Sequence, residues 1–377
     1  MSTENTLSNE KVFNEKVFNE KVLLKGNEAI SEGAIRAGCT AFFGYPITPQ
    51  NEIPAYMSLH MLDRGRIFIQ AESEVAAINM VYGASAAGAR AMTSSSSPGI
   101  SLKQEGISYA AGADIPCVIA NVSRGGPGLG SIAPAQGDYF QSTRGGGHGD
   151  YYCIVLAPKS VQECADFTYL AFDLADNYRM PVIVLADGMI GQMMEGVVLP
   201  PERALNELPK RPWTVGYMSD TADSKGNVRE PRHISSINLV PVELEAKTKA
   251  RFERYEVIKK NELRFEDLDT IDADITLAAY GTCARVCLGA KKLAEKEGIK
   301  VGLFRPITLW PFPYGVLGKI GERGKPILTV EMSLGQMVED VRLSVYDKAP
   351  IHFLGHTGGV IPTEEEVFGE IRKILGK

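Results

Sequence analysis

Short apolar segments that alternate with helix-like segments are the feature that most constrains the fold of this chain. Strands are predicted at 67–71, 116–123 and 180–187, and 160–178 has the apolar pattern of an amphipathic helix. Strands that alternate with helices build a parallel sheet covered by helices on both faces. The pattern therefore predicts an α/β fold, and a second α/β pattern begins near residue 275.

The chain is predicted to contain two domains and a charged connection. A first α/β domain is expected over 24–199 and a smaller one over 266–377, whereas 200–265 is a solvated connection with one exposed helix. Residues 1–23 hold the repeat NEKVF-NEKVF-NEKVL, whose period matches neither a helix nor a strand. We expect this low-complexity extension to carry no chemistry.

Charge and composition exclude several classes of protein. The 377 residues carry a formal net charge of −6, whereas a nucleic-acid-binding protein normally presents a basic surface. No apolar run is long enough to cross a bilayer, and the first residues lack the features of a secretory signal. A soluble cytoplasmic protein with neither nucleic acid nor membrane as a partner is therefore expected.

The six cysteines are too scattered to hold an iron–sulfur cluster, which normally needs four grouped thiolates. Cys283 and Cys287 are four residues apart, so both are expected on one face of a helix. We expect all six to be reduced thiols, buried or half-buried, and we predict no metal site on this chain.

Four loops that follow strands of the first domain carry the residues best suited to bind a ligand, because open α/β sheets bind ligands at the carboxyl ends of their strands. They are GYPITPQNE (44–52), QAESE (70–74), SSSSPG (94–99) and SRGGPGLG (123–130).

Each candidate residue in these loops also has a purely structural interpretation. Thr48 lies between two prolines that fix the backbone, which suits a hydroxyl aimed at a ligand, but it can equally cap a helix. Glu72 and Glu74 either stabilise the first turn of a helix or supply a half-buried carboxyl for acid–base chemistry. Arg124 either lies on the surface or binds a carboxylate with its planar guanidinium group.

The segment 128–133 matches the glycine pattern of dinucleotide-binding loops. Such a loop must open a helix directly, and Pro134 and Gly137 interrupt any helix here. We therefore do not expect a nicotinamide cofactor.

Taken together, these motifs resemble those of the alpha subunits of 2-oxoacid:ferredoxin oxidoreductases, which depend on thiamine diphosphate. The resemblance runs from Leu24 to the C-terminus and is carried by KGNEAISEGAIRAGC, GYPITPQNE, AESEVAAINMVYGASAAGARAMTSSSSPGISL, SRGGPG, GGGHGDY and RPITLWPFP. It implies a pyrimidine-binding domain of the thiamine type, followed by a domain like the small α/β domain at the end of transketolases. The segments around Arg305 and Trp310 are expected at an interdomain or inter-subunit contact.

The resemblance also implies roles for residues that match the motifs of the family. Glu74 matches the glutamate that hydrogen-bonds N1′ of the aminopyrimidine ring, so it is expected to bind the cofactor and to be catalytic. Thr48 matches a hydroxyl that contacts the substrate, and Arg124 matches an arginine near the substrate carboxylate. The cofactor-binding loop of the family is matched by Tyr45, Pro46 and Ile47.

The resemblance implies a hetero-oligomer that is inactive as a single chain. The sequence lacks the Gly-Asp-Gly motif followed by Asn with which thiamine enzymes hold the diphosphate and Mg²⁺. A beta subunit is therefore expected to bind the diphosphate half and Mg²⁺, and partner chains are expected to carry the iron–sulfur cluster. Gamma and ferredoxin-like delta subunits are further partners that the family allows.

The expected reaction is the CoA-dependent oxidative decarboxylation of a 2-oxo acid to an acyl-CoA, with electrons passed to ferredoxin. The SRGGPGLG and GGGHGDY segments favour 2-oxoisovalerate, and 2-oxoglutarate and pyruvate stay open as alternatives. The second carboxylate of 2-oxoglutarate needs another cation, for which Arg144, His148 and groups of a partner chain are candidates. A non-enzymatic α/β ligand-binding module is the alternative outside the family.

Overall fold

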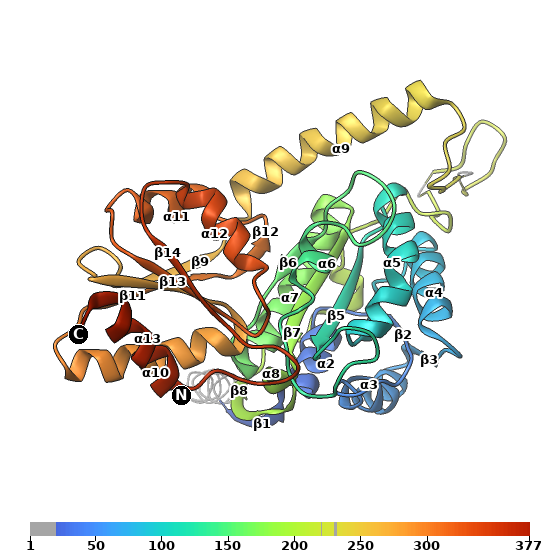
Figure 1. The fold of residues 1–377 in the computed structure, drawn as a ribbon. Coiled ribbons are helices and arrows are strands. Elements are labelled where there is room, and N and C mark those ends of the chain that lie inside the picture. Colours follow the sequence, from blue (N-terminus) through green and yellow to red (C-terminus); the bar gives the residue numbers. More distant parts are fainter. Residues whose placement is uncertain (1–19, 220, 230–231) are drawn as a thin grey trace, which may run out of the picture.

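The structure is a computed structural model that describes residues 20–219, 221–229 and 232–377. The NEKVF repeat lies outside this range except for its last residues. Two sheets with helices on both faces organise the described chain, and one long helix projects from them (Figure 1). The predicted α/β class with parallel sheets is confirmed.

The first sheet has its strands in the order β12-β6-β7-β5-β4-β2-β3. β5 and β7 are buried at every residue because helices cover both of their faces, whereas β3 is an exposed edge. The parallel strands are β2 (Ala41–Gly44), β3 (Ile67–Gln70), β4 (Ala91–Ser95), β5 (Cys117–Ser123), β6 (Ile154–Leu156) and β7 (Pro181–Asp187).

Helices cover both faces of this sheet (Figure 1). α2 (Gly26–Arg36), α3 (Glu52–Asp63) and α7 (Val161–Tyr178) pack together over one face. α4 (Glu74–Ala86) and α5 (Ser97–Gly112) pack against each other over the opposite face. Two short helices lie in loops, α6 (Tyr139–Thr143) and α8 (Gly188–Gln192).

The second sheet is smaller and has the order β14-β13-β10-β11-β9. Its strands are β9 (Phe265–Leu268), β10 (Ile275–Ala278), β11 (Val301–Pro306), β13 (Ile327–Glu331) and β14 (Ile351–Gly355). The helices that cover it are α10 (Gly281–Lys296) with α13 (Glu364–Leu375), and α11 (Tyr314–Gly321) with α12 (Met337–Val345).

One strand of the predicted second domain belongs to the first sheet. β12 (Thr308–Trp310) begins two residues after β11 ends and pairs antiparallel with β6. The chain therefore crosses from one sheet to the other within residues 306–308. Local sequence patterns cannot show this, because the pairing joins residues that are far apart in the chain.

The folded part of the chain begins before Leu24. β1 (Lys21–Lys25) pairs antiparallel with β8 (Met194–Val198), so residues 21–23 form a strand although the sequence analysis placed them in the extension. This small sheet ties the start of the described chain to the segment that follows α8.

Buried polar contacts hold the two sheets together. Arg305 at the end of β11 is fully buried, and its guanidinium group forms two hydrogen bonds with Glu163 of α7, at 2.9 and 2.5 Å. The same group lies 3.1 Å from a carboxylate oxygen of Glu266. The predicted interdomain contact around Arg305 and Trp310 is therefore confirmed.

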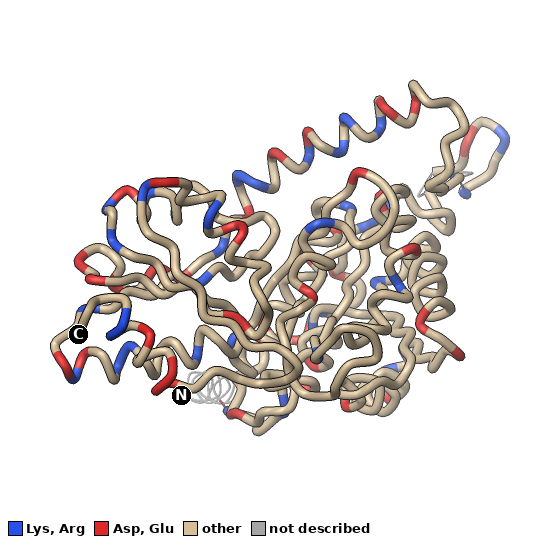
Figure 2. The backbone as a smooth tube through the Cα atoms, in the orientation of Figure 1, with Lys and Arg blue, Asp and Glu red and all other residues tan. Residues whose placement is uncertain are grey.

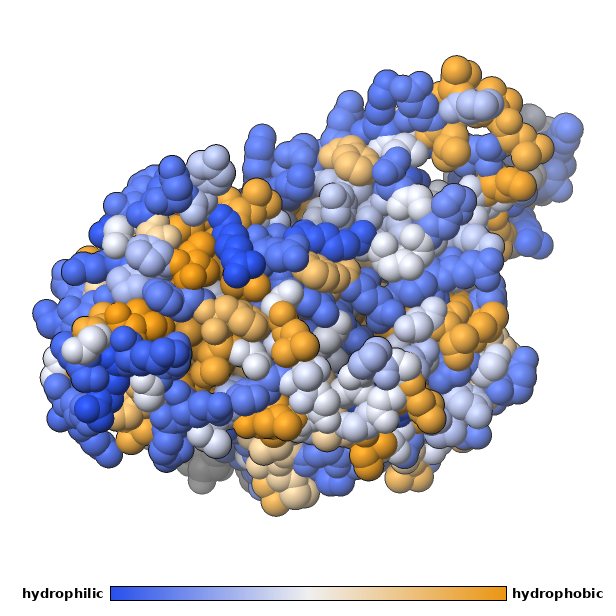
Figure 3. Space-filling view, viewed as in Figure 1, coloured by the Kyte–Doolittle hydropathy of each residue, from blue (hydrophilic) through white to orange (hydrophobic). Residues whose placement is uncertain are grey.

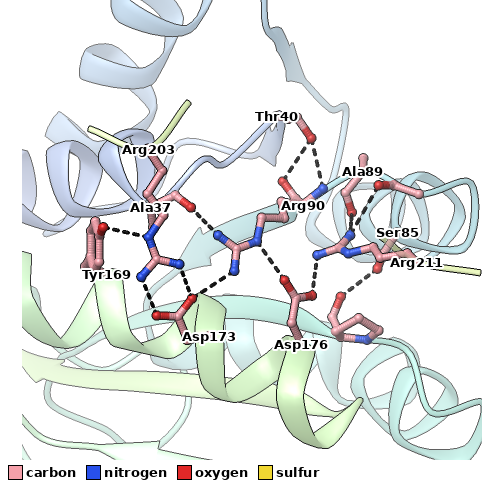
Figure 4. A network of polar contacts seen from close by, with 12 residues as sticks. Ala37, Thr40, Ser85, Ala89, Arg90, Tyr169, Asp173, Asp176, Arg203 and Arg211 are labelled. Carbon is pink, nitrogen blue, oxygen red and sulfur yellow. Dashed lines mark hydrogen bonds and ion pairs between the residues drawn. The ribbon is translucent and has the colours of Figure 1, made fainter. Parts of the chain in front are cut away.

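The connection after β8 is anchored to the first domain by a network of ion pairs (Figure 4). Arg90 lies between Asp173 and Asp176 of α7, at 3.1 and 2.7 Å. Arg203 and Arg211 reach the same two carboxylates from the connection. The start of the connection is thus held against α7 by ion pairs.

The helix α9 (Pro241–Asn261) projects from the body of the molecule, and basic and acidic residues alternate along it (Figure 2). Its second half packs against the first domain through Arg251, Tyr255 and Ile258. Apolar side chains gather near its first residues (Figure 3), where Leu239 and Val242 are 86% and 70% exposed.

The cysteine and membrane expectations can be compared with the structure. All six cysteines are buried free thiols, and Cys283 and Cys287 both lie in α10, as predicted. Among the described residues, no helix is both long and apolar enough to span a membrane.

We expect the substitution Arg305→Met to destabilise the protein by about 3 kcal/mol or more, because it leaves the Glu163 carboxylate without its buried partner. The control is Lys348→Met, which removes an exposed pair with Glu322 and should cost at most about 1 kcal/mol. Denaturant unfolding measures both values. Equal decreases in the free energy of unfolding for the two variants would show that the interdomain pair does not stabilise the protein more than an exposed pair does.

Candidate functional site

The four candidate loops lie side by side at one edge of the first sheet. They follow β2, β3, β4 and β5, which are neighbours in the order β5-β4-β2-β3 and run parallel. Their carboxyl ends therefore meet at the same edge, as the sequence predicted.

Glu74 is the buried carboxyl of this edge. It is the first residue of α4, its side chain is 6% exposed, and the Ser73 hydroxyl caps the helix by accepting from the Ala76 amide. Glu72, in contrast, is exposed and fits its structural interpretation. Only one of the two carboxyls that the sequence singled out therefore has the environment expected for a ligand site.

Gly99 leaves room for this carboxyl. A methyl group on Gly99 would lie 2.6 Å from Oε1 of Glu74 and 2.1 Å from the Ser95 hydroxyl oxygen. Within the described chain, the Ser95 and Ser96 hydroxyls are fully buried and have no hydrogen-bond partner. The Glu74 carboxyl and the Ser95 hydroxyl thus pack closely against the start of α5, at a position where only glycine fits.

The loop after β2 is held from several sides. The Pro49 carbonyl accepts hydrogen bonds from Asn27 at 2.8 Å and from Gln192 at 2.7 Å. Gln50 is fully buried, donates to the Tyr45 carbonyl and accepts from the Ser94 hydroxyl. The loop conformation is therefore fixed by hydrogen bonds from side chains of neighbouring elements and by the buried Gln50 of the loop itself.

Arg124 and Thr48 are brought together. Nη1 of Arg124 donates to the Thr48 carbonyl at 2.8 Å, and Nη2 donates to the Leu129 carbonyl at 3.0 Å. The guanidinium group is 7% exposed, and its Nε has no partner among the described residues. Thr48 is half-buried and does not cap α3, because Asn51 is the residue that precedes this helix.

Asp138 is a buried carboxyl that the sequence analysis missed. It accepts hydrogen bonds from Ser97 at 2.7 Å and from Asn121 at 2.8 Å, and burial raises its pKa above the usual range. Ser97 also accepts from the Arg124 amide, so Asp138 fixes the loop after β5 to the start of α5. No local motif distinguishes it from a surface aspartate.

Lys103 is a second missed residue. It lies on α5, is fully buried, and donates to the Glu74 carbonyl at 3.3 Å. Burial lowers its pKa to about 8, against the opposing effect of the Glu74 charge. Its spacing from Ile100 and Ile107 places it on the apolar face of α5, and this is the signal that could have identified it.

The two candidate cations for a second carboxylate differ in their surroundings. Arg144 pairs with the buried Asp340 of α12 at 2.8 Å, so its charge is already engaged. His148 is exposed, and its carbonyl accepts a hydrogen bond from Ser108.

Two further features of the described residues concern the segment 128–133 and the grouping of potential metal ligands. No helix follows Gly130 until Tyr139, so the dinucleotide-like segment 128–133 does not open one. Within the ranges that the structure describes, no group of three or more His, Cys, Asp or Glu residues is placed to share a metal ion.

The chain matches two family models. Residues 32–261 match the model "Pyruvate flavodoxin/ferredoxin oxidoreductase, thiamine diP-bdg", and residues 273–367 match "Pyruvate:ferredoxin oxidoreductase core domain II". These two ranges contain most of the first and second sheets, respectively.

Relatives match the chain along nearly its whole length. The ketoisovalerate oxidoreductase subunit VorB of Methanothermobacter marburgensis is 48% identical over 94% of this chain and 98% of the relative. The 2-oxoglutarate synthase subunit KorA of Methanothermobacter thermautotrophicus is 36% identical over 93% of this chain and 98% of the relative.

Solved structures share the fold. The 2-oxoglutarate:ferredoxin oxidoreductase from Magnetococcus marinus, with 2-oxoglutarate, coenzyme A and succinyl-CoA bound, matches with a TM-score of 0.83 and 28% identity, over 94% of this chain and 65% of that chain. A split-gene transketolase matches with a TM-score of 0.57 and 13% identity over 94% of this chain and 98% of that chain, which shows a shared fold alone.

Family models, relatives and structure agree with the loop motifs at the edge of the first sheet. The chain belongs to the family of 2-oxoacid:ferredoxin oxidoreductases, as an alpha-type subunit.

Proposed function

We propose that this chain binds the aminopyrimidine half of thiamine diphosphate at Glu74 and serves the oxidative decarboxylation of 2-oxoisovalerate to an acyl-CoA. The observation that carries the proposal is the buried Glu74 carboxyl at the edge where four loops meet. A buried carboxyl in an enzyme of this family has a clear task, because it can hold one ring nitrogen of the pyrimidine.

The residues around Glu74 fit an aminopyrimidine ring. Such a ring carries nitrogen acceptors and an amino donor, and the site offers a carboxyl and the unpaired hydroxyls of Ser95 and Ser96. Gly99 lets the carboxyl and the Ser95 hydroxyl approach the start of α5 closely. Tyr45, Pro46 and Ile47 would border the ring from the loop after β2.

Thiamine diphosphate, when bound, supplies the carbon nucleophile for the carbonyl group of a 2-oxo acid, and the protein supplies binding, orientation and electrostatics. Glu74 would hold N1′ of the pyrimidine and share a proton with it. Arg124, whose buried Nε has no partner among the described residues, would bind the substrate carboxylate, and Thr48 would contact the substrate beside it.

Partner subunits are needed to complete the enzyme. Apolar side chains are exposed on the elements that build the candidate site: Val75 of α4, Leu102 of α5, and Leu129 and Ile132 of the loop after β5 are between 40% and 81% exposed. Exposed apolar groups that cluster around a polar site are typical of protein contacts. We propose that a beta subunit covers this edge and holds the diphosphate and Mg²⁺, while iron–sulfur clusters on partner chains pass electrons to ferredoxin and CoA accepts the acyl group.

The proposed substrate is 2-oxoisovalerate, for two reasons. The identity to the ketoisovalerate subunit exceeds the identity to the 2-oxoglutarate subunit, 48% against 36%. In addition, Asp340 already pairs with Arg144, one of the cations that the sequence offered for a second carboxylate.

In the complex assembled with its partner subunits, Glu74→Gln should lower the turnover number by about two orders of magnitude, because an amide cannot share a proton with the pyrimidine. Steady-state reduction of a viologen dye measures this, and circular dichroism of the variant should match that of the parent. Near-normal turnover would remove the proposed role of Glu74.

Gly99→Ala should also impair the enzyme, because the added methyl group must displace Glu74 or Ser95. We expect turnover to fall at least tenfold, or by about 1.4 kcal/mol or more in activation free energy. The control is Gly83→Ala on α4, where a methyl group meets no atom within 4 Å and helix propensity favours alanine. Similar activities of the two variants would show that close packing of Glu74 against Gly99 is not needed for activity.

The substrate is tested with the native complex purified without oxygen. Thiamine-dependent and CoA-dependent viologen reduction should have a kcat/KM for 2-oxoisovalerate at least about tenfold above the values for 2-oxoglutarate and pyruvate. A preference for either of the other acids would overturn the substrate while leaving the family unaffected. The isolated chain should reduce no dye with any of the three.

A further inference from the structure

We infer that Lys103 is a positioning residue for Glu74, which anchors the first turn of α4 and supplies the positive charge beside the buried carboxylate. The inference rests on the proposed function of Glu74. It adds a residue to the site that no sequence motif had singled out.

The Lys103 ammonium group lies within hydrogen-bond distance of the Glu74 backbone. Lys103 is fully buried on α5, and within the described chain the Glu74 carbonyl is the acceptor found at hydrogen-bond distance, at 3.3 Å. α4 and α5 pack against each other, so any movement of Glu74 relative to α5 must break this contact. The ammonium group has three N–H donors, and one of them donates to this carbonyl.

Burial of an ammonium group is costly, and its retention needs a reason. Its neighbours along the same helix face, Ile100 and Ile107, are apolar and 1% exposed. A methionine would fill the same space without the cost of taking a charge out of water. Packing alone therefore does not account for a lysine at this position.

The charge of Lys103 can act on Glu74. Burial lowers the pKa of Lys103 to about 8 and the Glu74 carboxylate opposes that change, so most of the lysine is charged at pH 7. A positive charge close to a buried carboxyl favours its ionised form. Loss of the lysine charge would thus change the electrostatic surroundings of the carboxyl group that is proposed to hold N1′ of the pyrimidine.

The test compares Lys103→Met, Glu74→Gln and the double variant in the complex with its partner subunits and saturating thiamine diphosphate. For Lys103→Met we expect a lower melting temperature, because the buried Glu74 carboxylate loses its positive neighbour, together with a kcat at least about tenfold lower and a KM for the 2-oxo acid within about twofold of the parent. The double variant should be no slower than Glu74→Gln within about twofold, because both changes act on one group. The control Ile107→Val should lower the melting temperature and leave kcat unchanged.

Several outcomes would overturn the inference. A kcat of Lys103→Met within about twofold of the parent would show that the charge is not needed. A fold-decrease in kcat of the double variant equal to the product of the two single decreases would show that Lys103 acts independently of Glu74. A fully active Glu74→Gln variant would refute the proposed function of Glu74. An impaired Glu74→Gln variant beside a fully active Lys103→Met variant would refute only the role of Lys103. Should Lys103→Met not assemble, Lys103→Gln serves instead: its amide still carries a donor but no charge, and full activity would likewise overturn the inference.

Discussion

A carboxyl group buried at the carboxyl edge of a parallel sheet is the constraint on which the rest of the structure depends. A buried charge is tolerated only where neighbouring groups compensate for the lost water. Here the compensation comes from the start of α4 and from the charge of Lys103, whose ammonium group donates to the Glu74 backbone carbonyl. The Ser95 and Ser96 hydroxyls nearby have no partner among the described residues.

The second domain stabilises the loops that form this edge. Gln136 follows the Arg124 loop and forms hydrogen bonds with the backbone of Met332 and Tyr280. Asp187 at the end of β7 accepts from the amide and the hydroxyl of Thr282 at 2.9 and 2.6 Å. The loops of the first sheet are therefore held from a second sheet, and this arrangement gives the site a rigid support although it is built from loops.

Sequence patterns predicted the local elements well and the long-range ones poorly. The apolar runs of β5 and β7 and the helical period of α7 follow from residues close in the chain, and so does the common edge of the four loops. The transfer of β12 to the first sheet does not, because its partner β6 lies 150 residues earlier. Asp138 was missed because its burial comes from the packing of loops that are far apart in the chain, whereas Lys103 could have been identified from its place on the apolar face of α5.

The most direct measurement of the central claim is an experimental map of the complete complex with thiamine diphosphate bound. It should place a carboxylate oxygen of Glu74 within about 3 Å of N1′ of the pyrimidine, with the diphosphate held by a partner chain. A cofactor bound entirely by other subunits, or a Glu74 carboxyl that faces water away from any subunit boundary, would contradict the account.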